Sequence, residues 1–339
     1  MESLIDIQKR LLPDLLEVMQ KRHHILRSIR FLQPVGRRSL AQNMGLTERV
    51  LRSEVEFLKN QDLIDIKTSG MIMTGDGIQL LEKLEGMMRE ISGINSMEQE
   101  LKSLLNLHQI VIVPGNSDES PWVKEELGRA SASSMKRRLK GNTIIAVTGG
   151  STMAAVAEML TPDFSDDALF VPARGGIGED VKNQANTICA KMAEHTKTRH
   201  RVLYVPDQVS KEVYKSFLKE PMIKEVLNLI KSANMVLHGI GDAITMAERR
   251  KTTEEDFEKI TGGHAVGEAF GYYFNEAGEV VHKVPTIGLQ LEDLSHIENV
   301  IAVAGGSSKA KAIRAYMKSA PASTVLITDE GAARELLKG

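Results

Sequence analysis

The sequence has very little cysteine and no long apolar run. Cys189 is the sole cysteine among 339 residues, so no intrachain disulfide can form and a disulfide-stabilised scaffold is excluded. No segment approaches the run of about 18 apolar residues that a membrane helix needs. Charged residues such as Asp14 and Glu17 interrupt the apolar pattern near the start, unlike a signal peptide. These absences predict a cytoplasmic protein without a membrane partner.

The sequence also lacks a strong net charge, but one segment is basic. The formal charge is −2 and 42% of the residues are hydrophobic, so neither global disorder nor general polyanion binding is indicated. Residues 21–59, however, hold nine lysines and arginines against three glutamates. The length exceeds that of one typical domain. We therefore expect two domains, of which one binds an anionic partner.

The basic segment has the pattern of a helix-turn-helix. A first helix is predicted to end at Gln33–Gly36, a short second helix to begin at Ser39, and a third to be capped by Thr47 with Val50 facing inward. In this arrangement the last helix enters the major groove of DNA. The residues predicted to contact DNA are Arg37, Arg38, Arg49, Arg52 and Ser53. The alternative is a three-helix module that docks another protein through a solvated basic face.

Two further segments complete the N-terminal part. Residues 63–67 and 71–74 alternate around Thr68–Gly70 and predict a two-stranded wing. Residues 78–106 form an amphipathic connector with a possible hinge near Gly93, which either packs on its own domain or pairs with a second copy. We expect a winged helix-turn-helix domain at 1–90, the connector helix to about 106, and a second domain at 107–339.

From residue 107 onward, strand and helix patterns alternate. This alternation predicts a Rossmann-like, mainly parallel α/β sheet, and residues 269–274 and 279–283 predict an added hairpin. The strand candidates are residues 109–113, 144–147, 169–172, 202–205, 235–237, 300–303 and 324–327. Ligands of such sheets collect at the carboxyl ends of the strands.

Two glycine-containing loops at such strand ends have the chemistry of phosphate sites. Thr148–Thr152 and Ala304–Lys309 each join an apolar strand to a helix and combine glycines with serine or threonine hydroxyls. Backbone N–H groups at a helix start favour a bound anion. Ordinary strand-to-helix turns use the same residues, so either loop alone is weak evidence. Together the loops indicate a ligand with two phosphates.

Other polar residues also follow predicted strands. Arg174 could grip a phosphate or form a structural salt bridge, and Gln184 could bond sugar hydroxyls. Asp242 and Glu268 could move protons, as in a sugar-phosphate isomerase, or only accept hydrogen bonds from a sugar. The nine histidines have no metal-ligand spacing, so we expect no metal site.

Several of these segments together resemble a known family. The segments are Gly36–Leu40, Glu48–Arg52, Phe170–Gly176, Asn183–Asn186 and Ala304–Lys309. Over essentially the whole chain the sequence resembles the SorC family of bacterial sugar-responsive regulators. The resemblance implies an effector domain related to glucosamine-6-phosphate deaminase and ribose-5-phosphate isomerase. It also implies an oligomeric repressor of glycolytic genes, a dimer or tetramer, that fructose 1,6-bisphosphate releases from double-stranded operator DNA. No cofactor is implied.

The resemblance also implies roles for individual residues. It places Ser151 and Thr152 at one phosphate, and Ser307, Ser308 and Lys309 at or near the other end of the site. The residues implied to hold the remaining groups are Arg174, Gly175, Gly176, Gln184, Arg249 and Glu268. Arg249 is favoured over its neighbour Arg250 only through the resemblance, and the loop that holds each phosphate stays open. The alternative function is a sugar-phosphate isomerase or deaminase with an added helical domain.

Overall fold

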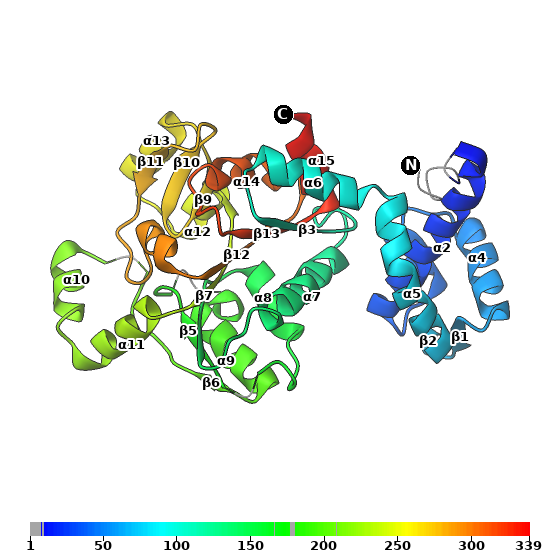
Figure 1. Cartoon of the computed structure of the whole chain (residues 1–339), viewed down its shortest axis with the longest axis horizontal. Coiled ribbons are helices and arrows are strands. Elements are labelled where there is room, and N and C mark those ends of the chain that lie inside the picture. Colours follow the sequence, from blue (N-terminus) through cyan, green and yellow to red (C-terminus); the bar gives the residue numbers. More distant parts are fainter. Residues whose placement is uncertain (1–7, 9, 166, 177–179, 208) are drawn as a thin grey trace. The chain divides into compact units, whose positions relative to one another are not determined.

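The protein folds into two compact units, Met1–Ser96 and Met97–Gly339 (Figure 1). The computed structural model describes residues 8, 10–165, 167–176, 180–207 and 209–339. No helix within these described residues is long and apolar enough to span a membrane.

The first unit packs helices on a two-stranded antiparallel hairpin. Its elements are α2 (Pro13–Leu32), α3 (Arg37–Asn43), α4 (Glu48–Asn60), β1 (Ile64–Lys67), β2 (Gly70–Met73) and α5 (Gly75–Ile91). Ile25 of α2, Leu40 of α3 and Leu51 of α4 are fully buried and meet Met71 of β2 in one apolar cluster. Burying these side chains together fixes the angles between the three helices, of which the short α3 and α4 would be marginal alone.

The sequence predicted the start of α4 correctly but placed the start of α3 two residues too late. The Thr47 hydroxyl accepts a hydrogen bond from the Val50 amide at 3.3 Å, which confirms the predicted cap of α4. The short helix begins at Arg37 rather than Ser39, because Gly36 adopts the extended conformation of an N-cap. Val50 was wrongly predicted to face inward: it is 39% exposed, since the buried face of α4 begins at the next residue.

The predicted connector is two helices rather than one. The first, α5, ends at Ile91, and α6 (Ile94–Leu104) begins after a break in which Gly93 has φ +71°. A residue in the left-handed backbone conformation commonly ends a helix, and glycine adopts this conformation without strain. Leu81 of α5 belongs to the core of the first unit. At this position the connector packs on its own domain.

The second unit is built on a seven-stranded parallel sheet. In sequence order its strands are β3 (Gln109–Val113), β4 (Thr143–Val147), β5 (Ala168–Pro172), β6 (Arg199–His200), β7 (Met235–Gly239), β12 (Asn299–Val303) and β13 (Val325–Asp329). They lie side by side in the order β3-β13-β12-β7-β4-β5-β6. The predicted mainly parallel sheet is therefore confirmed.

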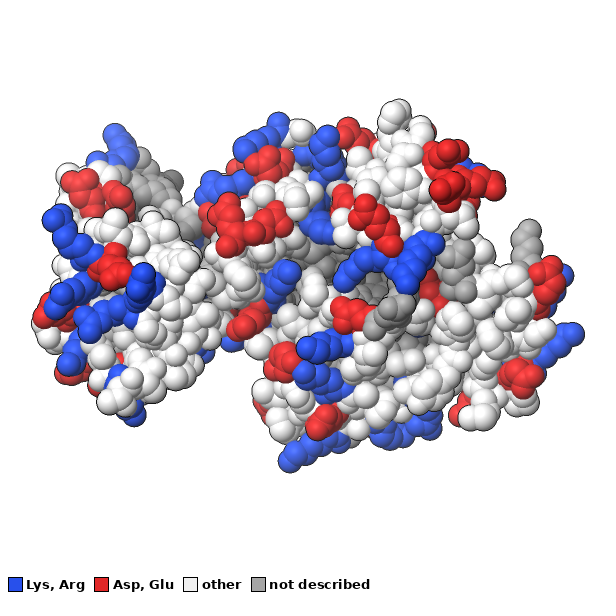
Figure 2. All heavy atoms as spheres, turned by 180° about the vertical axis from the view of Figure 1, so that it is seen from behind, with Lys and Arg blue, Asp and Glu red and all other residues white. Residues whose placement is uncertain are grey.

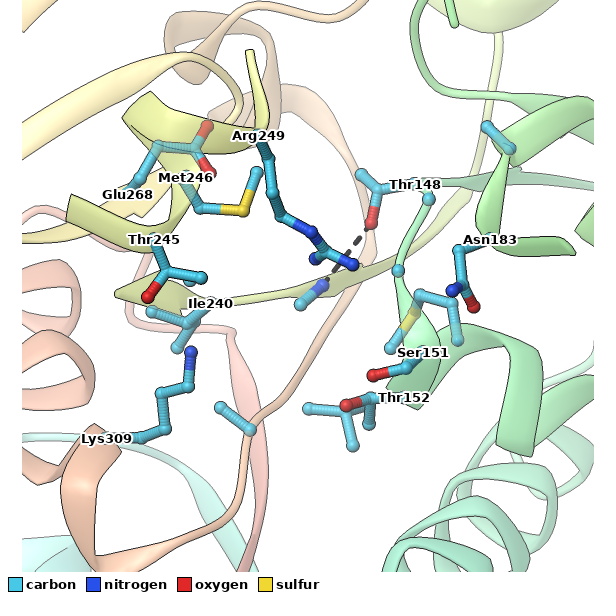
Figure 3. A pocket seen from close by; sticks show the side chains of 18 of the residues that line it. Thr148, Ser151, Thr152, Asn183, Ile240, Thr245, Met246, Arg249, Glu268 and Lys309 are labelled. Atoms are coloured by element: carbon cyan, nitrogen blue, oxygen red, sulfur yellow. Dashed lines mark hydrogen bonds between the residues drawn. The ribbon is translucent and has the colours of Figure 1, made fainter. Parts of the chain in front are cut away.

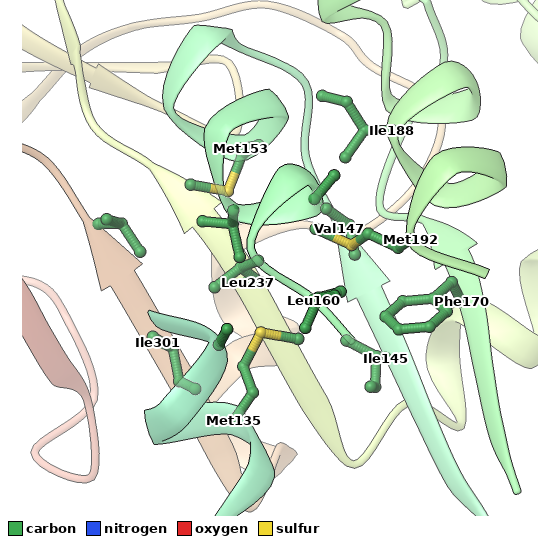
Figure 4. Packing of buried hydrophobic residues seen from close by; sticks show 14 of the residues in the cluster. Met135, Ile145, Val147, Met153, Leu160, Phe170, Ile188, Met192, Leu237 and Ile301 are labelled. Carbon is green, nitrogen blue, oxygen red and sulfur yellow. The ribbon is translucent and has the colours of Figure 1, made fainter. Parts of the chain in front are cut away.

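Helices cover both faces of this sheet. On one face α7 (Trp122–Lys136), α8 (Ser151–Glu158) and α9 (Ala185–Thr196) pack their apolar sides on alternate strand residues (Figure 4). On the other face α14 (Ala310–Met317) approaches through the Tyr316 hydroxyl, which lies 3.1 Å from Nε2 of His238. Strands buried on both faces need continuous apolar sequence, which explains why they were predictable.

One predicted strand is wrong. Residues 202–205 form no strand, and the edge strand is the shorter β6 that precedes them. The Asn186 side chain supplies the hydrogen bonds that a neighbouring strand would otherwise provide. Its amide oxygen accepts from the Leu203 N–H at 2.9 Å, and its amide nitrogen donates to the Leu203 carbonyl at 3.0 Å. Leu203 and Val205 are thus buried at the sheet edge without joining the ladder, whereas Tyr204 between them is 83% exposed.

A second sheet, antiparallel and four-stranded, lies beside the carboxyl ends of the first. Its strands, in the order β11-β10-β9-β8, are β11 (Val280–Lys283), β10 (Tyr272–Asn275), β9 (Ala265–Ala269) and β8 (Gly241–Asp242). The predicted continuous strand at 269–274 is wrong, because Phe270 and Gly271 have φ of +54° and +83° and form a turn. The predicted hairpin after this turn is present.

Candidate functional site

The second unit contains a pocket of about 460 Å³ at the carboxyl ends of β4, β5, β7 and β12. Residues of β9 and of α12 (Ala243–Arg249) line it as well (Figure 3). This volume suits a small metabolite. The position agrees with the rule that open parallel sheets bind ligands beyond the ends of their strands.

The first glycine loop opens into this pocket. The hydroxyls of Ser151 and Thr152 line the cavity at the first turn of α8 and have no hydrogen-bond partner among the described residues. Gly150 has φ +123°, and its N–H donates to the Asn183 carbonyl at 2.9 Å. A Cβ on Gly149 would lie 2.6 Å from the same carbonyl. The glycines therefore hold the loop tightly while its hydroxyls remain available to a ligand.

The second glycine loop is closed by the protein's own side chains. The Gly306 N–H donates to Asp329 at 2.7 Å, the Ser307 N–H to Asn116 at 3.2 Å, and the Ser308 N–H to Asp118 at 2.8 Å. Both serine hydroxyls donate to the Asp118 carboxylate at 3.1 Å. Ser307 and Ser308, predicted to meet a phosphate, thus have their donors engaged and do not line the pocket, whereas Lys309 does.

Three members of a buried cluster of four charged residues, Arg174, Arg250 and Glu268, line one side of the pocket, and Asp207 is the fourth. Arg174 donates to both oxygens of Asp207 at 2.6 and 2.9 Å, and Arg250 donates to Glu268 at 2.8 Å and to the Tyr273 hydroxyl at 3.0 Å. The four charged side chains are only 2–5% exposed. The bidentate grip of Arg174 is therefore directed at a carboxylate, which matches the salt-bridge alternative for this residue.

The arginines keep Glu268 ionised. Burial alone would raise the pKa of this carboxyl, but Arg250, Arg174 and the Gly271 N–H hold it below its ordinary value. Asp242, the other candidate base, accepts bonds from the N–H and hydroxyl of Thr245 at 2.9 and 2.8 Å and so caps α12. Glu268 is thus held by internal partners, and Asp242 serves as the cap of α12.

Three cations, Arg249, Lys309 and Lys124, line the cavity without an ion-pair partner among the described residues. Arg249 projects inward from the end of α12 and Lys309 from the second loop, towards the space beside Ser151 and Thr152 (Figure 3). Burial lowers the pKa of Lys309, although Asp242 and Asp118 act to raise it. Arg250 is engaged in the buried cluster, so the geometry favours Arg249 of this pair as the residue that meets a ligand.

The remaining predicted residues divide between the pocket and its surroundings. Gly175 and Gln184 line the pocket, whereas Gly176 borders a separate shallow hollow. A Cβ on Gly175 would lie 2.5 Å from the Pro206 carbonyl, so this glycine allows close packing. Sequence reasoning missed Asp118, Lys124 and Met246, which also line the cavity. No local pattern marks them, because tertiary packing alone brings them there.

No metal site is formed by the described residues: they contain no group of three or more histidine, cysteine, aspartate or glutamate side chains placed to hold an ion.

Most basic residues of the first unit lie on its surface, although Arg27 is buried. Figure 2 shows lysine and arginine side chains over this unit, drawn at the left. The predicted DNA-contact residues Arg37, Arg38, Arg49, Arg52 and Ser53 are all exposed. Arg38 lies 3.6 Å from Glu48, whereas Arg49 and Arg52 form no ion pair with any described residue. Exposed cations on one short helix can approach an anionic polymer without breaking an internal contact.

Comparison with known proteins matches both parts of the chain. A family model described as "CggR N-terminal DNA binding domain" matches residues 18–88, and one described as "Putative sugar-binding domain" matches residues 89–338. The Central glycolytic genes regulator of Priestia megaterium is 63% identical over 340 residues, which cover 100% of this chain and 99% of the relative. Its Bacillus subtilis counterpart is 59% identical over 339 residues, with the same coverage.

Solved structures show the same fold. A SorC family transcriptional regulator from Enterococcus faecalis superposes with a TM-score of 0.68 at 48% identity, covering 71% of this chain and 99% of that one. The full-length sorbitol operon regulator SorC from Klebsiella pneumoniae gives a TM-score of 0.64 and covers 90% of this chain and 94% of that one. At 18% identity the second likeness concerns the fold alone.

Proposed function

Because the chain belongs to the SorC family of transcriptional regulators, in the group of central glycolytic genes regulators, we propose that it represses glycolytic genes and that fructose 1,6-bisphosphate releases it from its operator. It is a DNA-binding regulator with a sugar-binding domain, and not an enzyme. The proposal concerns the sign of regulation and the identity of the sugar.

The pocket chemistry supports a phosphorylated sugar. Unpartnered hydroxyls of Ser151 and Thr152 at a helix start suit one phosphate, and the Arg249 and Lys309 cations suit the second. Gln184 adds amide groups that could bond sugar hydroxyls between them. The single observation that carries the proposal is this pairing of an open anion socket with the Arg249 and Lys309 cations, which form no ion pair with any described residue.

In the first unit we propose a winged helix-turn-helix in which α4 enters the major groove and the β1–β2 hairpin is the wing. The exposed arginines Arg49 and Arg52 support this role for α4. We assign residues 1–90 to this domain, the connector to about 106, and residues 107–339 to an effector and oligomerisation domain related to sugar-phosphate deaminases and isomerases. A dimer or tetramer would place several such domains on one operator.

The coupling between the two sites follows from linkage. A ligand can lower operator affinity only as far as it prefers a conformation that binds DNA less well. We propose that the bisphosphate favours an arrangement of the oligomer in which the DNA-binding domains are badly spaced for the operator.

A titration of the full-length protein on its own promoter DNA tests the proposed function. Binding should depend on sequence and on salt, and fructose 1,6-bisphosphate should weaken it. Fructose 6-phosphate, which offers a single phosphate, should be a much weaker inducer. An equal response to the two sugars would contradict the bisphosphate proposal, and tighter operator binding in the presence of either sugar would contradict release.

Replacing Arg52 with alanine tests the groove contact. If this arginine reads a base edge, specific operator binding should weaken by about 1–3 kcal/mol, since a bidentate arginine contact to guanine is of that size. Binding is measured by fluorescence anisotropy at fixed salt, with nonspecific DNA as the reference. Glu56→Gln is the control, because Glu56 lies exposed on the same helix and carries no positive charge.

If Arg52→Ala leaves operator affinity unchanged, Arg52 is not a reading residue. Arg49, one turn earlier on the same helix, is then the residue to change.

A further inference from the structure

The segment between β3 and α7 carries a carboxylate that occupies the second glycine loop. Asp118 accepts hydrogen bonds from the Ser308 N–H at 2.8 Å and from the hydroxyls of Ser307 and Ser308 at 3.1 Å each. A Cβ on Gly306 would lie 2.4 Å from Oδ1 of Asp118, so the carboxylate rests directly against this glycine. An anion therefore already sits where the sequence predicted a phosphate.

Other contacts hold this segment in place. Asn116 accepts a hydrogen bond from the Ser307 N–H at 3.2 Å and donates to its hydroxyl at 3.2 Å. The Ser117 N–H donates to the buried Asp329 at 2.8 Å, and Asp329 also accepts from the Gly306 N–H. The position of Asp118 thus depends on its neighbours as well as on its own three bonds.

The charge of Asp118 also acts on the cavity. Asp118 lines the same pocket as Lys309, and each of these charges affects the titration of the other. An incoming phosphate at this end would meet the Lys309 cation together with a fixed negative charge. At the Ser151–Thr152 end, no carboxylate among the described residues accepts a hydrogen bond from the loop.

We propose that Asp118 is a specificity-determining residue of the effector pocket, whose carboxylate takes the second loop in place of a ligand phosphate and limits the affinity for a doubly phosphorylated sugar. This inference rests on the proposed function. The phosphate at this end then relies on the Lys309 and Arg249 side chains rather than on loop N–H groups. If the role of Asp118 were merely structural, removal of its carboxylate should weaken the binding of the bisphosphate instead of strengthening it.

The test compares Asp118→Asn and Asp118→Ala with the wild-type protein by isothermal titration calorimetry. In both variants fructose 1,6-bisphosphate should bind about two- to fivefold more tightly, the range expected when one partly exposed charge is removed. Fructose 6-phosphate should change by less than about twofold, because one phosphate can use the open first loop. The bisphosphate should also release operator DNA at a correspondingly lower concentration.

Glu119→Gln is the matched control. It removes one negative charge from the same segment, and the glutamine amide oxygen can still accept the hydrogen bond that Glu119 receives from Asn116 at 3.0 Å. Its affinity for both sugars should match the wild type. If this control tightens bisphosphate binding as much as Asp118→Asn does, net charge is responsible and the assignment to Asp118 is wrong.

Two outcomes for the folded Asp118 variants overturn the proposal: unchanged or weaker binding of the bisphosphate in both, or an equal gain for both sugars. The failure of the proposed function itself is recognised separately, since the wild type would then bind neither sugar. In that event inorganic phosphate is the probe. It should raise the melting temperature of Asp118→Ala more than that of the wild type, and an equal rise would refute the role of Asp118.

Discussion

Replacing Arg250 with methionine is expected to lower the free energy of unfolding of the second unit by about 3–5 kcal/mol, the cost of removing one partner from a buried ion pair. The Arg250 side chain is 2% exposed and donates to Glu268 and to Tyr273. Its loss leaves two buried carboxylates, Asp207 and Glu268, with Arg174 as the one remaining cation of the cluster. Methionine fills much of the volume, so packing contributes little to the loss.

Thermal unfolding of the full-length protein measures this effect. For a unit of this size the melting temperature should fall by about 6–20 °C. Arg249→Met is the matched control, because the adjacent arginine is exposed and has no ion pair among the described residues. Its stability should change by no more than about 0.5 kcal/mol. In contrast, it should weaken binding of the bisphosphate.

The reverse pattern would exchange the roles of the two residues. If Arg250→Met melts like the wild type while Arg249→Met is destabilised, the buried cluster does not stabilise the fold as its geometry implies.

The adjacent residues Arg249 and Arg250 show how much of the site could be predicted from the sequence. Arg249 and Arg250 have the same chemistry and differ only in the direction that α12 gives each side chain. That direction depends on the packing of α12 against β9, which places Glu268 beside the second arginine. A resemblance could favour one of the pair, but local pattern could not.

Most of the parallel sheet was predictable because its central strands are buried on both faces and are therefore largely apolar, unlike the exposed edge strand β6. The same signal misassigned residues 202–205, where Leu203 is buried and the Asn186 side chain takes up the hydrogen bonds of its backbone. The turn at Phe270–Gly271 was missed as well, because phenylalanine seldom adopts a positive φ. An apolar pattern thus does not report which partner supplies the backbone hydrogen bonds.

The two glycine loops show the same limit at the candidate site. Both follow a strand and open a helix, and from sequence they looked equivalent. Asp118 is separated from Ser308 by 190 positions and meets it only because β3, β13 and β12 are neighbours in the sheet. The loops therefore differ in whether a carboxylate of the protein binds them, and this depends on the strand order of the sheet rather than on the residues of the loops.

This difference leads to an expected result for paired substitutions in the two loops. Thr152→Val removes a hydroxyl that has no partner among the described residues, with little change in shape. If this hydroxyl donates to a ligand phosphate, the loss should be about 1.5–3 kcal/mol, the usual size of a hydrogen bond to a charged group. The concentration of fructose 1,6-bisphosphate that releases operator DNA should then rise roughly ten- to a hundredfold.

Ser308→Ala should behave differently, although it also removes one hydroxyl from a glycine loop. The Ser308 hydroxyl already donates to Asp118 at 3.1 Å, so a ligand gains nothing from it and the affinity should stay within about threefold of the wild type. Calorimetry of bisphosphate binding and the midpoint of operator release are measured for both variants, and operator binding without sugar should be unchanged. If Ser308→Ala weakens the bisphosphate as much as Thr152→Val does, the second loop must open to receive a phosphate. Equal affinity of Thr152→Val and the wild type would instead remove the first loop from the site.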